Sequence, residues 1–515
     1  MDASQRTNSV RRGETNPFMK RTYLAGALLL GAGVVLAATL PRQERIYPFH
    51  YEDVLGTSLE LKVLAPSEGQ AEKAEAAVLE EIAREAKILS AWDASSEFSR
   101  WAATWNEPLH VSPELLEVLG MFDQWRDRTG GALDASAEAV VRVWKQAAAE
   151  NRMPTQAELR AATALVKQKH WSLDLAAGTA THLDRTPIAL NSFAKSYIMQ
   201  HAAEAALAAG TSGVVVNIGG DIAIRGNWME PVEVADPFNP AENAAPVARL
   251  TLQDHAIATS GNYKRGVEIG GRHYSHIIDP RTGETADSIV SSTVVSKDAA
   301  QAGALATAMS VLRPEESRTL VASLGGGIEY LIIDSKGAKY QSAGWNRIAA
   351  MPAKTAAAPM AEDAPMELVL DLEIKQPAGF AKRPYVAVWV EDKDKFPVRT
   401  MALWYDRDRW LPELRAWYHD DRLRAVAEGT QITSSVASAT RGAGKYSVKW
   451  DGKDNAGKPV KPGKYTIFVE ASREHGPYQI LKGEIDTTAG AKTITLTGNT
   501  DIASANAEYR RAEKR

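Results

Sequence analysis

An alanine- and proline-rich stretch interrupts the chain between Asn346 and Met366, and it separates two regions of different pattern. Its sequence, RIAAMPAKTAAAPMAEDAP, has no hydrophobic period and would bury too little apolar surface to offset its chain entropy. We therefore expect an interdomain linker at 346–365, a first domain at 46–345 and a second at 366–500, followed by a polar tail at 501–515. A chain of 515 residues has room for two such domains.

The first domain mixes helical and strand patterns. Residues 71–89 place Val78 and Ile82 on one face of an alanine-rich segment, which predicts a surface-packed helix. Further helices are predicted at 112–128, 155–168, 193–208 and 297–312, and strands at 59–64, 213–218, 247–251 and 291–295. The two kinds of element interleave irregularly, and no glycine fingerprint opens a helix after the first strand. This pattern favours an α+β fold over a Rossmann sheet.

The second domain consists of short, strand-like runs. They lie at 366–374, 385–391, 399–405, 446–450, 464–471 and 492–497. A dense set of turn-forming residues, 451–463, separates two of the runs, as is typical of an antiparallel β-sandwich. Asp451 and Asp454 lack the alternating ligands of a calcium loop, so a plain turn is favoured. Tryptophans at 389, 404, 410, 417 and 450 indicate core packing, with a carbohydrate-stacking surface as the alternative.

The segment at 1–45 contains an apolar run that points to export. Tyr23–Leu40 is almost wholly apolar and follows Lys20 and Arg21, which predicts a signal peptide or a membrane anchor. Small residues at Ala37 and Ala38 suit cleavage, and the run has the minimum length for a membrane span. We expect a periplasmic protein, or one anchored in the inner membrane and facing the periplasm. A buried helix in a cytoplasmic fold is the alternative.

Charge and cysteine content exclude several classes of function. The 60 Lys and Arg residues are balanced by 64 Asp and Glu, giving a net charge of −4, which argues against nucleic acid as a partner. The absence of cysteine excludes disulfides, thiolate metal sites and thiol nucleophiles.

Four polar, glycine-containing motifs of the first domain carry candidate chemistry. Paired glycines in 217–221 and 130–134 allow a ligand to approach the backbone closely. The turn at 258–263 offers two hydroxyls and backbone amides to an anion. His276 lies close to a carboxylate at a strand-to-turn junction, a usual setting for a general base. Taken alone, each motif also fits an ordinary turn or a buried histidine.

Taken in order, these motifs resemble those of the ApbE family, the FAD:protein FMN transferases. The matching stretches are 55–57, 89–97, 129–134 followed by Trp144, 193–195 with Tyr197, 219–221, 236–237, 258–261, 276–280 and 304–308. The resemblance covers about half of the chain. The second domain is similar to a β-rich module of unknown function that sometimes follows ApbE domains in exported proteins.

The resemblance implies a magnesium-dependent enzyme that cleaves FAD, releases AMP and transfers FMN to a threonine or serine of an exported or membrane flavoprotein. It implies His276 as the base. It also implies that Mg²⁺ is held by the Ser192 carbonyl and the Thr307 hydroxyl, with Ala306 beside them. The FAD-binding residues that it implies are Leu55, Ala132, Leu133, Asp134, Lys195, Gly219, Gly220, Asp221, Thr259, Ser260, Gly261 and Ile278.

The sequence departs from the family pattern where the metal is expected. The principal metal carboxylate of the family corresponds to Gly303, and a second aspartate corresponds to Ala189. Ser196 replaces the usual glycine, and Leu55 the usual methionine. Because Mg²⁺ prefers anionic oxygen ligands, a site without its carboxylate is weakened, unless Asp287 or another ligand completes it. Three hypotheses stay open: an active FMN transferase, a catalytically impaired FAD-binding protein, and a structural or interaction protein acting through the β-sandwich.

Overall fold

The structure is a computed structural model that describes residues 44–239, 241–262, 265–349, 366–375, 382–406, 408–474, 476–498 and 500–511. The predicted N-terminal signal or anchor lies outside these residues, as does most of the predicted linker. The described residues from Ile46 onward belong to one compact unit. None of the helices in the described part of the chain is long and apolar enough to span a bilayer.

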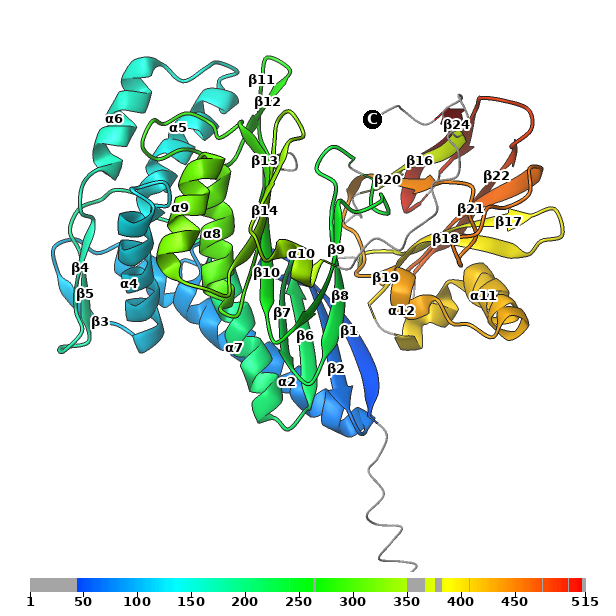
Figure 1. Ribbon diagram of the computed structural model, residues 1–515, viewed down its shortest axis with the longest axis horizontal. Helices are drawn as coiled ribbons and strands as arrows, with labels where there is room; N and C mark the ends of the chain where they lie inside the picture. Colours follow the sequence, from blue (N-terminus) through cyan, green and yellow to red (C-terminus); the bar gives the residue numbers. More distant parts are fainter. Residues whose placement is uncertain are drawn as a thin grey trace, which may run out of the picture. The chain divides into compact units, whose positions relative to one another are not determined.

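An eight-stranded sheet forms the centre of the first domain (Figure 1). Its strands, in spatial order, are β1 (Arg45–Val54), β2 (Thr57–Ala65), β6 (Gly213–Ile218), β7 (Asp221–Gly226), β10 (Ala256–Gly261), β13 (Ile289–Ser296), β14 (Glu329–Asp334) and β15 (Lys339–Gln341). From β2 to β15 each strand pairs antiparallel with the next. This arrangement confirms the predicted α+β class.

Helices cover one face of the sheet, and a β-hairpin covers part of the other. Val214 and Val216 of β6 pack into a core shared with α2 (Glu68–Leu89), α7 (Ala194–Ala208) and α8 (Ala299–Val311). Val215 faces the opposite way, into a second core with β8 (Met229–Val234) and β9 (Ala248–Gln253). Side chains alternate between the faces of a strand, so a run of valines supplies both cores. Alanines on α7 and α8 let these helices approach the sheet closely.

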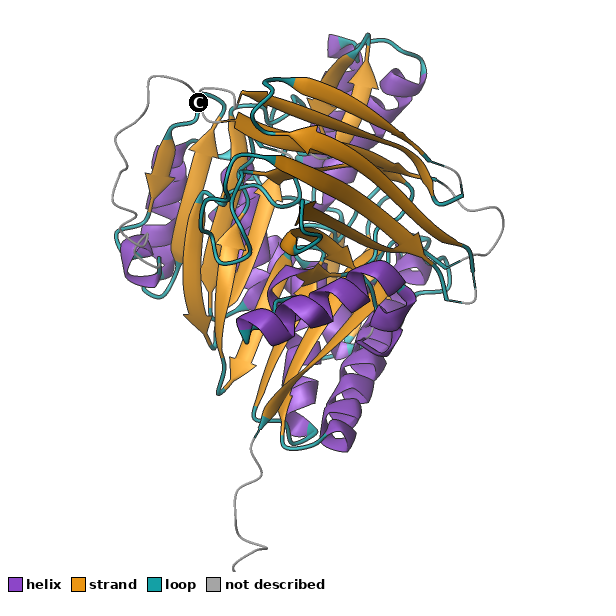
Figure 2. Cartoon of the chain, turned by 90° about the vertical axis from the view of Figure 1, so that its right-hand side faces the viewer, coloured by secondary structure: helices purple, strands orange, loops and turns teal. Residues whose placement is uncertain are grey.

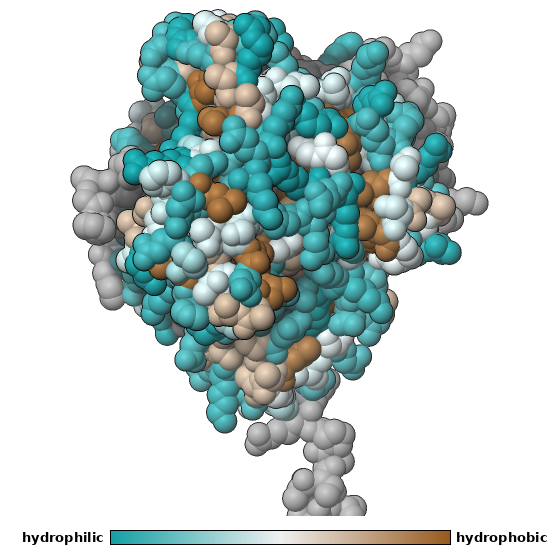
Figure 3. All heavy atoms as spheres, turned by 90° about the vertical axis from the view of Figure 1, so that its left-hand side faces the viewer, coloured by the Kyte–Doolittle hydropathy of each residue, from teal (hydrophilic) through white to brown (hydrophobic). Residues whose placement is uncertain are grey.

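The remaining elements of the first domain are short, apart from α4 (Pro113–Arg128), α5 (Glu138–Ala149), α6 (Gln156–Val166) and α9 (Pro314–Leu324). The short ones are α3 (Glu97–Ala102), β3 (Pro108–His110), η1 (Ala135–Ala137), β4 (Trp171–Asp174), β5 (Thr179–His182), β11 (Gly266–Ile269), β12 (Arg272–Ser275) and α10 (Trp345–Ile348). The side of the molecule that carries α4 to α6 is largely hydrophilic, with apolar atoms in small patches (Figure 3).

The second domain is a sandwich of two sheets, as predicted (Figure 2). One sheet has the order β20 (Gly444–Trp450), β16 (Met366–Ile374), β24 (Ile502–Arg511) and β23 (Lys492–Thr497). The other has the order β19 (Ala437–Ser438), β18 (Pro397–Trp404), β17 (Tyr385–Asp392), β21 (Lys464–Ser472) and β22 (Tyr478–Asp486). An apolar core lies between them. Trp389, Trp404, Trp417 and Trp450 are buried, so packing explains them, and Trp410 is half-buried.

The sequence predicted some of the regular elements of both domains. A helix or strand forms at each predicted range, and α2 begins after Ser67, whose hydroxyl accepts the amide of Gln70. Residues 451–463 form turns in which Asp454 Oδ1 accepts two backbone amides.

The prediction of a polar tail at 501–515 was wrong. The predicted polar tail begins with Asp501, but residues 502–511 form β24, which pairs with both β16 and β23. Small alanines and Tyr509 alternate with polar residues there and fill the sandwich core. The domain also contains helices, among them η2 (Asp408–Glu413), α11 (Arg415–Glu428) and α12 (Thr433–Val436). In α11, Trp417, Asp421 and Arg424 share the buried face at helical spacing.

Candidate functional site

A cleft of about 640 Å³ in the first domain brings most of the predicted site residues together. Its size is in the usual range for small-molecule sites. The predicted residues that line it are Ala132, Leu133, Asp134, Ser192, Lys195, Gly219, Gly220, Asp221, Thr259, Ser260, Gly261, His276, Ile278 and Thr307. Residues separated by almost 180 positions in sequence therefore face one cavity.

Leu55 and Ala306 are the two predicted site residues that lie outside this lining. Leu55 is half-buried in the turn between β1 and β2, with a left-handed φ of 51°. Ala306 is buried inside α8, and its carbonyl accepts the Ser310 hydroxyl at 3.0 Å. Helix packing thus explains Ala306.

A glycine turn between β6 and β7 forms one edge of the cleft. Gly219 and Gly220 have φ values of 66° and 101°, which residues with side chains rarely adopt. A Cβ on Gly219 would lie 2.7 Å from Thr57 Oγ1, so this glycine is also required by the close approach of the β1–β2 turn. Asn217 Oδ1 accepts the Gly220 amide at 3.0 Å, and the turn leads directly into Asp221.

Asp221 is the carboxylate held at the centre of this site. Its Oδ1 accepts the Thr259 amide at 3.1 Å, and its Oδ2 accepts the Ser196 hydroxyl at 3.4 Å. Desolvation raises the pKa of Asp221 to about 6, although its two hydrogen bonds and the charges of Lys195 and Arg265 act in the opposite direction. Its charge therefore changes close to neutral pH.

The geometry of His276 is suited to accepting a proton. Its Nδ1 is 3.0 Å from the Arg265 carbonyl, which also accepts the His276 amide at 3.3 Å. A carbonyl oxygen only accepts hydrogen bonds, so Nδ1 carries the proton and Nε2 is the basic nitrogen. Desolvation lowers the pKa of His276, and the nearby charge of Arg265 lowers it further. The imidazole is therefore mainly neutral at pH 7.

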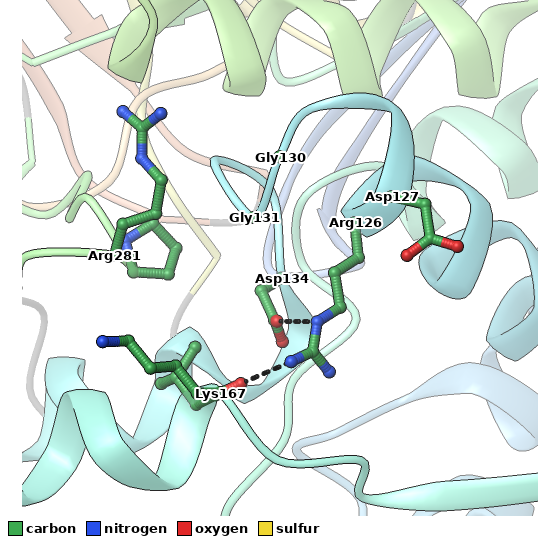
Figure 4. Close-up of a pocket in the computed structure, with 9 residues that line it drawn as sticks. Arg126, Asp127, Gly130, Gly131, Asp134, Lys167 and Arg281 are labelled. Atoms are coloured by element: carbon green, nitrogen blue, oxygen red, sulfur yellow. Dashed lines mark hydrogen bonds and ion pairs between the residues drawn. The ribbon is translucent and has the colours of Figure 1, made fainter.

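The loop at 129–134 is held by an ion pair beneath it (Figure 4). Arg126 Nε lies 3.0 Å from Asp134 Oδ2, and the Asp134 side chain is only 1% exposed. Asp134 Oδ1 accepts the amide and hydroxyl of Ser136, at 2.8 and 2.6 Å. The carboxylate of Asp134 thus braces the loop, and its neighbours Ala132 and Leu133 line the cleft with it.

Two lining residues were not identified from the sequence. Trp92 is 82% exposed at the cleft, and it lies within the 89–97 motif without having been assigned a role. An exposed indole beside a cavity offers an aromatic ring a surface for stacking. Arg265 follows the 258–263 motif and lines the cleft together with Lys195, but a single arginine after a turn carries little signal in sequence.

The residues expected to bind Mg²⁺ do not fit a magnesium site. The Thr307 hydroxyl donates to the Ser192 carbonyl at 3.2 Å, so these two predicted ligands bind each other. The side chains at 189 and 303 are those of alanine and glycine, and neither supplies an oxygen. Asp287, the considered substitute, accepts the Thr285 hydroxyl at 2.8 Å and is not among the lining residues.

A separate group of possible metal ligands lies on α2 and α7. Glu81, Glu85 and His201 bring ligand atoms within 4.8 Å of one another. Arg84 already pairs with both carboxylates, at 2.7 and 3.3 Å, and His201 Nδ1 is 2.5 Å from Glu85. Ion pairing within the group thus accounts for its arrangement.

Comparison with known proteins identifies the first domain. The ApbE family model matches residues 55–332, which is more than half of the chain. The chain belongs to the ApbE family. A second family model, described as "Predicted periplasmic protein (DUF2271)", matches residues 367–504.

ApbE relatives with curated names share the first domain. A protein of Klebsiella pneumoniae (strain 342), named FAD:protein FMN transferase, is 27% identical over 328 residues, covering 62% of this chain and 94% of the relative. A protein of Vibrio cholerae with the same name is 31% identical over 239 residues, covering 44% of this chain and 70% of the relative.

Solved ApbE structures share the fold of this domain. The crystal structure of the ApbE protein of Thermotoga maritima is 26% identical, with a TM-score of 0.54, and covers 60% of this chain and 100% of that protein. The flavin transferase ApbE of Vibrio cholerae is 24% identical, with a TM-score of 0.50 over 59% of this chain and 99% of that one, and supports the fold alone.

Proposed function

We propose that this ApbE protein is an FAD:protein FMN transferase that binds FAD in the 640 Å³ cleft and transfers FMN to a threonine or serine of an exported flavoprotein. The observation that carries the proposal is that His276, Thr259 and Lys195 line one cavity of suitable size. The names of the Klebsiella and Vibrio relatives, both FAD:protein FMN transferase, support the same reaction.

The reaction needs a base and positive charge, and the cleft offers both. His276 Nε2 accepts the proton of the acceptor hydroxyl, whose oxygen then attacks the phosphorus of the FMN half. A new P–O bond forms to the acceptor, and the bond to AMP breaks, so that AMP leaves with the bonding electrons. Lys195 and Arg265 are the lining cations that can offset the phosphate charge. Trp92 supplies a stacking surface for a ring of FAD.

Magnesium has no assigned step in this proposal. The Ser192 carbonyl and the Thr307 hydroxyl already form a hydrogen bond with each other. Gly303 has no side-chain oxygen, so none of these three residues supplies an anionic ligand. A bound divalent cation would neutralise phosphate charge, but this set of residues is a poor one for Mg²⁺.

We place this activity in the periplasm. The apolar run at 23–40 and the family description of the second domain both favour export. If the apolar run is retained, it anchors the protein in the inner membrane with its cleft on the periplasmic side.

A second candidate function is FAD binding without turnover. It is favoured by Gly303, because the expected metal carboxylate is missing while the residues that surround the cofactor cleft are present.

Incubation of the full chain with FAD and an exported flavoprotein tests both candidates. The transferase reading predicts covalent FMN on the acceptor, measured by intact mass, with one AMP released for each FMN attached. His276→Gln is expected to abolish both products. His273→Gln is the matched control, because His273 lies on β12 outside the lining and pairs with Glu268. Tight FAD binding without either product would select the second candidate, and no FAD binding would exclude both.

A further inference from the structure

We propose that this protein holds the pyrophosphate of FAD through Lys195 and Arg265 and not through a divalent cation. The proposal rests on the proposed use of the cleft for FAD, and it names the groups that replace the metal.

The space for a metal-binding side chain at 303 is occupied. A Cβ built on Gly303 would lie 2.5 Å from Ser196 Oγ, 3.2 Å from Ser196 Cβ and 3.3 Å from Phe193 Cβ. Rotation of the serine hydroxyl relieves only the first of these contacts. A carboxylate at 303 therefore requires α8 to move away from α7, unless the serine is also removed. Ser196 and Gly303 form a matched pair in this chain.

The polar groups around this position already form hydrogen bonds with one another. Ser196 Oγ donates towards Asp221 Oδ2, and Thr307 Oγ1 donates to the Ser192 carbonyl. A cation would have to compete with both contacts, and the Asp221 carboxylate beside them is already bonded to the Ser196 hydroxyl and to the Thr259 amide. Mg²⁺ seeks several oxygen ligands in octahedral geometry, and these residues do not offer them.

Two cationic side chains, Lys195 and Arg265, line the cleft. They are close enough for the charge of Arg265 to lower the pKa of Lys195, beyond the larger effect of desolvation. The Asp221 carboxylate offsets part of this positive charge, since it raises the pKa of Lys195, and a bound dianion would offset the remainder. The pyrophosphate of FAD carries two negative charges, and charge-assisted hydrogen bonds from Arg and Lys are strong.

The decisive experiment measures FAD affinity of the full wild-type chain by flavin fluorescence, in EDTA and in millimolar Mg²⁺. The proposal predicts that the two dissociation constants agree within about twofold, and that Arg265→Gln weakens binding about tenfold in both buffers. Arg272→Gln is the matched control, because Arg272 is exposed, stacks on Tyr274 and does not line the cleft. An increase of about tenfold or more in wild-type affinity with Mg²⁺ would overturn the proposal.

Designed variants test the pairing of Ser196 with Gly303 by a readout that needs no activity. Thermal unfolding with and without Mg²⁺ is expected to show no metal-dependent shift for wild type or for Gly303→Asp alone. The double variant Ser196→Gly/Gly303→Asp has room for the carboxylate, and its melting temperature is expected to rise with Mg²⁺. A Mg²⁺-dependent rise for wild type without FAD would contradict the proposal. Failure of wild type to bind FAD would instead contradict the proposed function.

Discussion

Replacing Arg126 with alanine is expected to loosen the 129–134 loop, part of which lines the cleft proposed to bind FAD. Arg126 Nε lies 3.0 Å from the buried Asp134 carboxylate. Its other nitrogens donate to the carbonyls of Val166 and Gln168, each at 2.8 Å. A single side chain therefore joins the loop to α6 (Figure 4).

The size of the effect follows from the charge that the substitution leaves behind. Removal of one partner from a buried ion pair costs about 3–5 kcal/mol. Asp134 keeps two hydrogen bonds from Ser136, so we expect the lower limit, about 3 kcal/mol, which is roughly a hundredfold in the local opening equilibrium. FAD binding is expected to weaken as well, because the loop that lines the cleft is less often in its closed form.

Loop opening is measured as the rate of hydrogen exchange of the loop's backbone amides, by mass spectrometry. The Gly131 amide donates to the Arg126 carbonyl, and the Ala132 amide donates to the Thr129 carbonyl, so both report on loop opening. Arg142→Ala is the matched control, because its ion pair with Glu138 is exposed and contributes only about 0.3–0.5 kcal/mol.

Two results of the exchange measurement would contradict this role of the Arg126–Asp134 ion pair. A change in loop exchange of less than about threefold would show that the ion pair does not hold the loop. Adding Asp134→Asn to Arg126→Ala removes the unpaired charge and should recover part of the protection. Equal exchange in the single and double variants would show that the buried charge is not the cause.

Three further predictions concern single side chains. Trp92→Ala removes an indole that is 82% exposed at the cleft, and should weaken FAD binding about tenfold and reduce quenching of flavin fluorescence. FAD affinity should rise as pH falls from 7.5 to 5, because Asp221, with its pKa raised to about 6, becomes neutral while the phosphates stay anionic; in Asp221→Asn the affinity at pH 7.5 should be higher than in wild type and should change less over the same range. Glu470 is fully buried and accepts two first-turn amides of α11, so Glu470→Ala should lower the free energy of unfolding of the second domain by about 2 kcal/mol in urea titrations.

Sequence reasoning succeeded where one local pattern determined the structure. The helical period at 71–89 and the valines at 214–216 predict α2 and β6 because burial of an apolar face selects those elements. It failed at β24, whose polar residues and small alanines read as a tail. Those alanines are buried because pairing with β16 and β23 places them in the core between the two sheets, and pairing between distant strands leaves little local signal.

The candidate site was likewise predictable where its residues form local motifs, and not where it depends on contacts between distant elements. The motif containing His276 and the glycine turn before Asp221 are evident in sequence, and the cleft brings both together. The ion pair beneath the 129–134 loop was not evident, because Arg126 reads as an ordinary charge at the end of a helix. Likewise, the occupation of the space at Gly303 by Ser196 depends on how closely α7 and α8 pack, which no motif encodes.

The most direct test of the account is an FAD titration of the full wild-type chain against a matched pair of lysine variants. Lys195 lines the cleft proposed to bind FAD, whereas Lys167 lines a neighbouring pocket with Arg126 and Arg281. We predict that one FAD binds per chain, that Lys195→Gln weakens its binding about tenfold, and that Lys167→Gln leaves it unchanged. Equal affinities for the two variants, or no saturable binding by wild type, would contradict the assignment of this cleft to FAD.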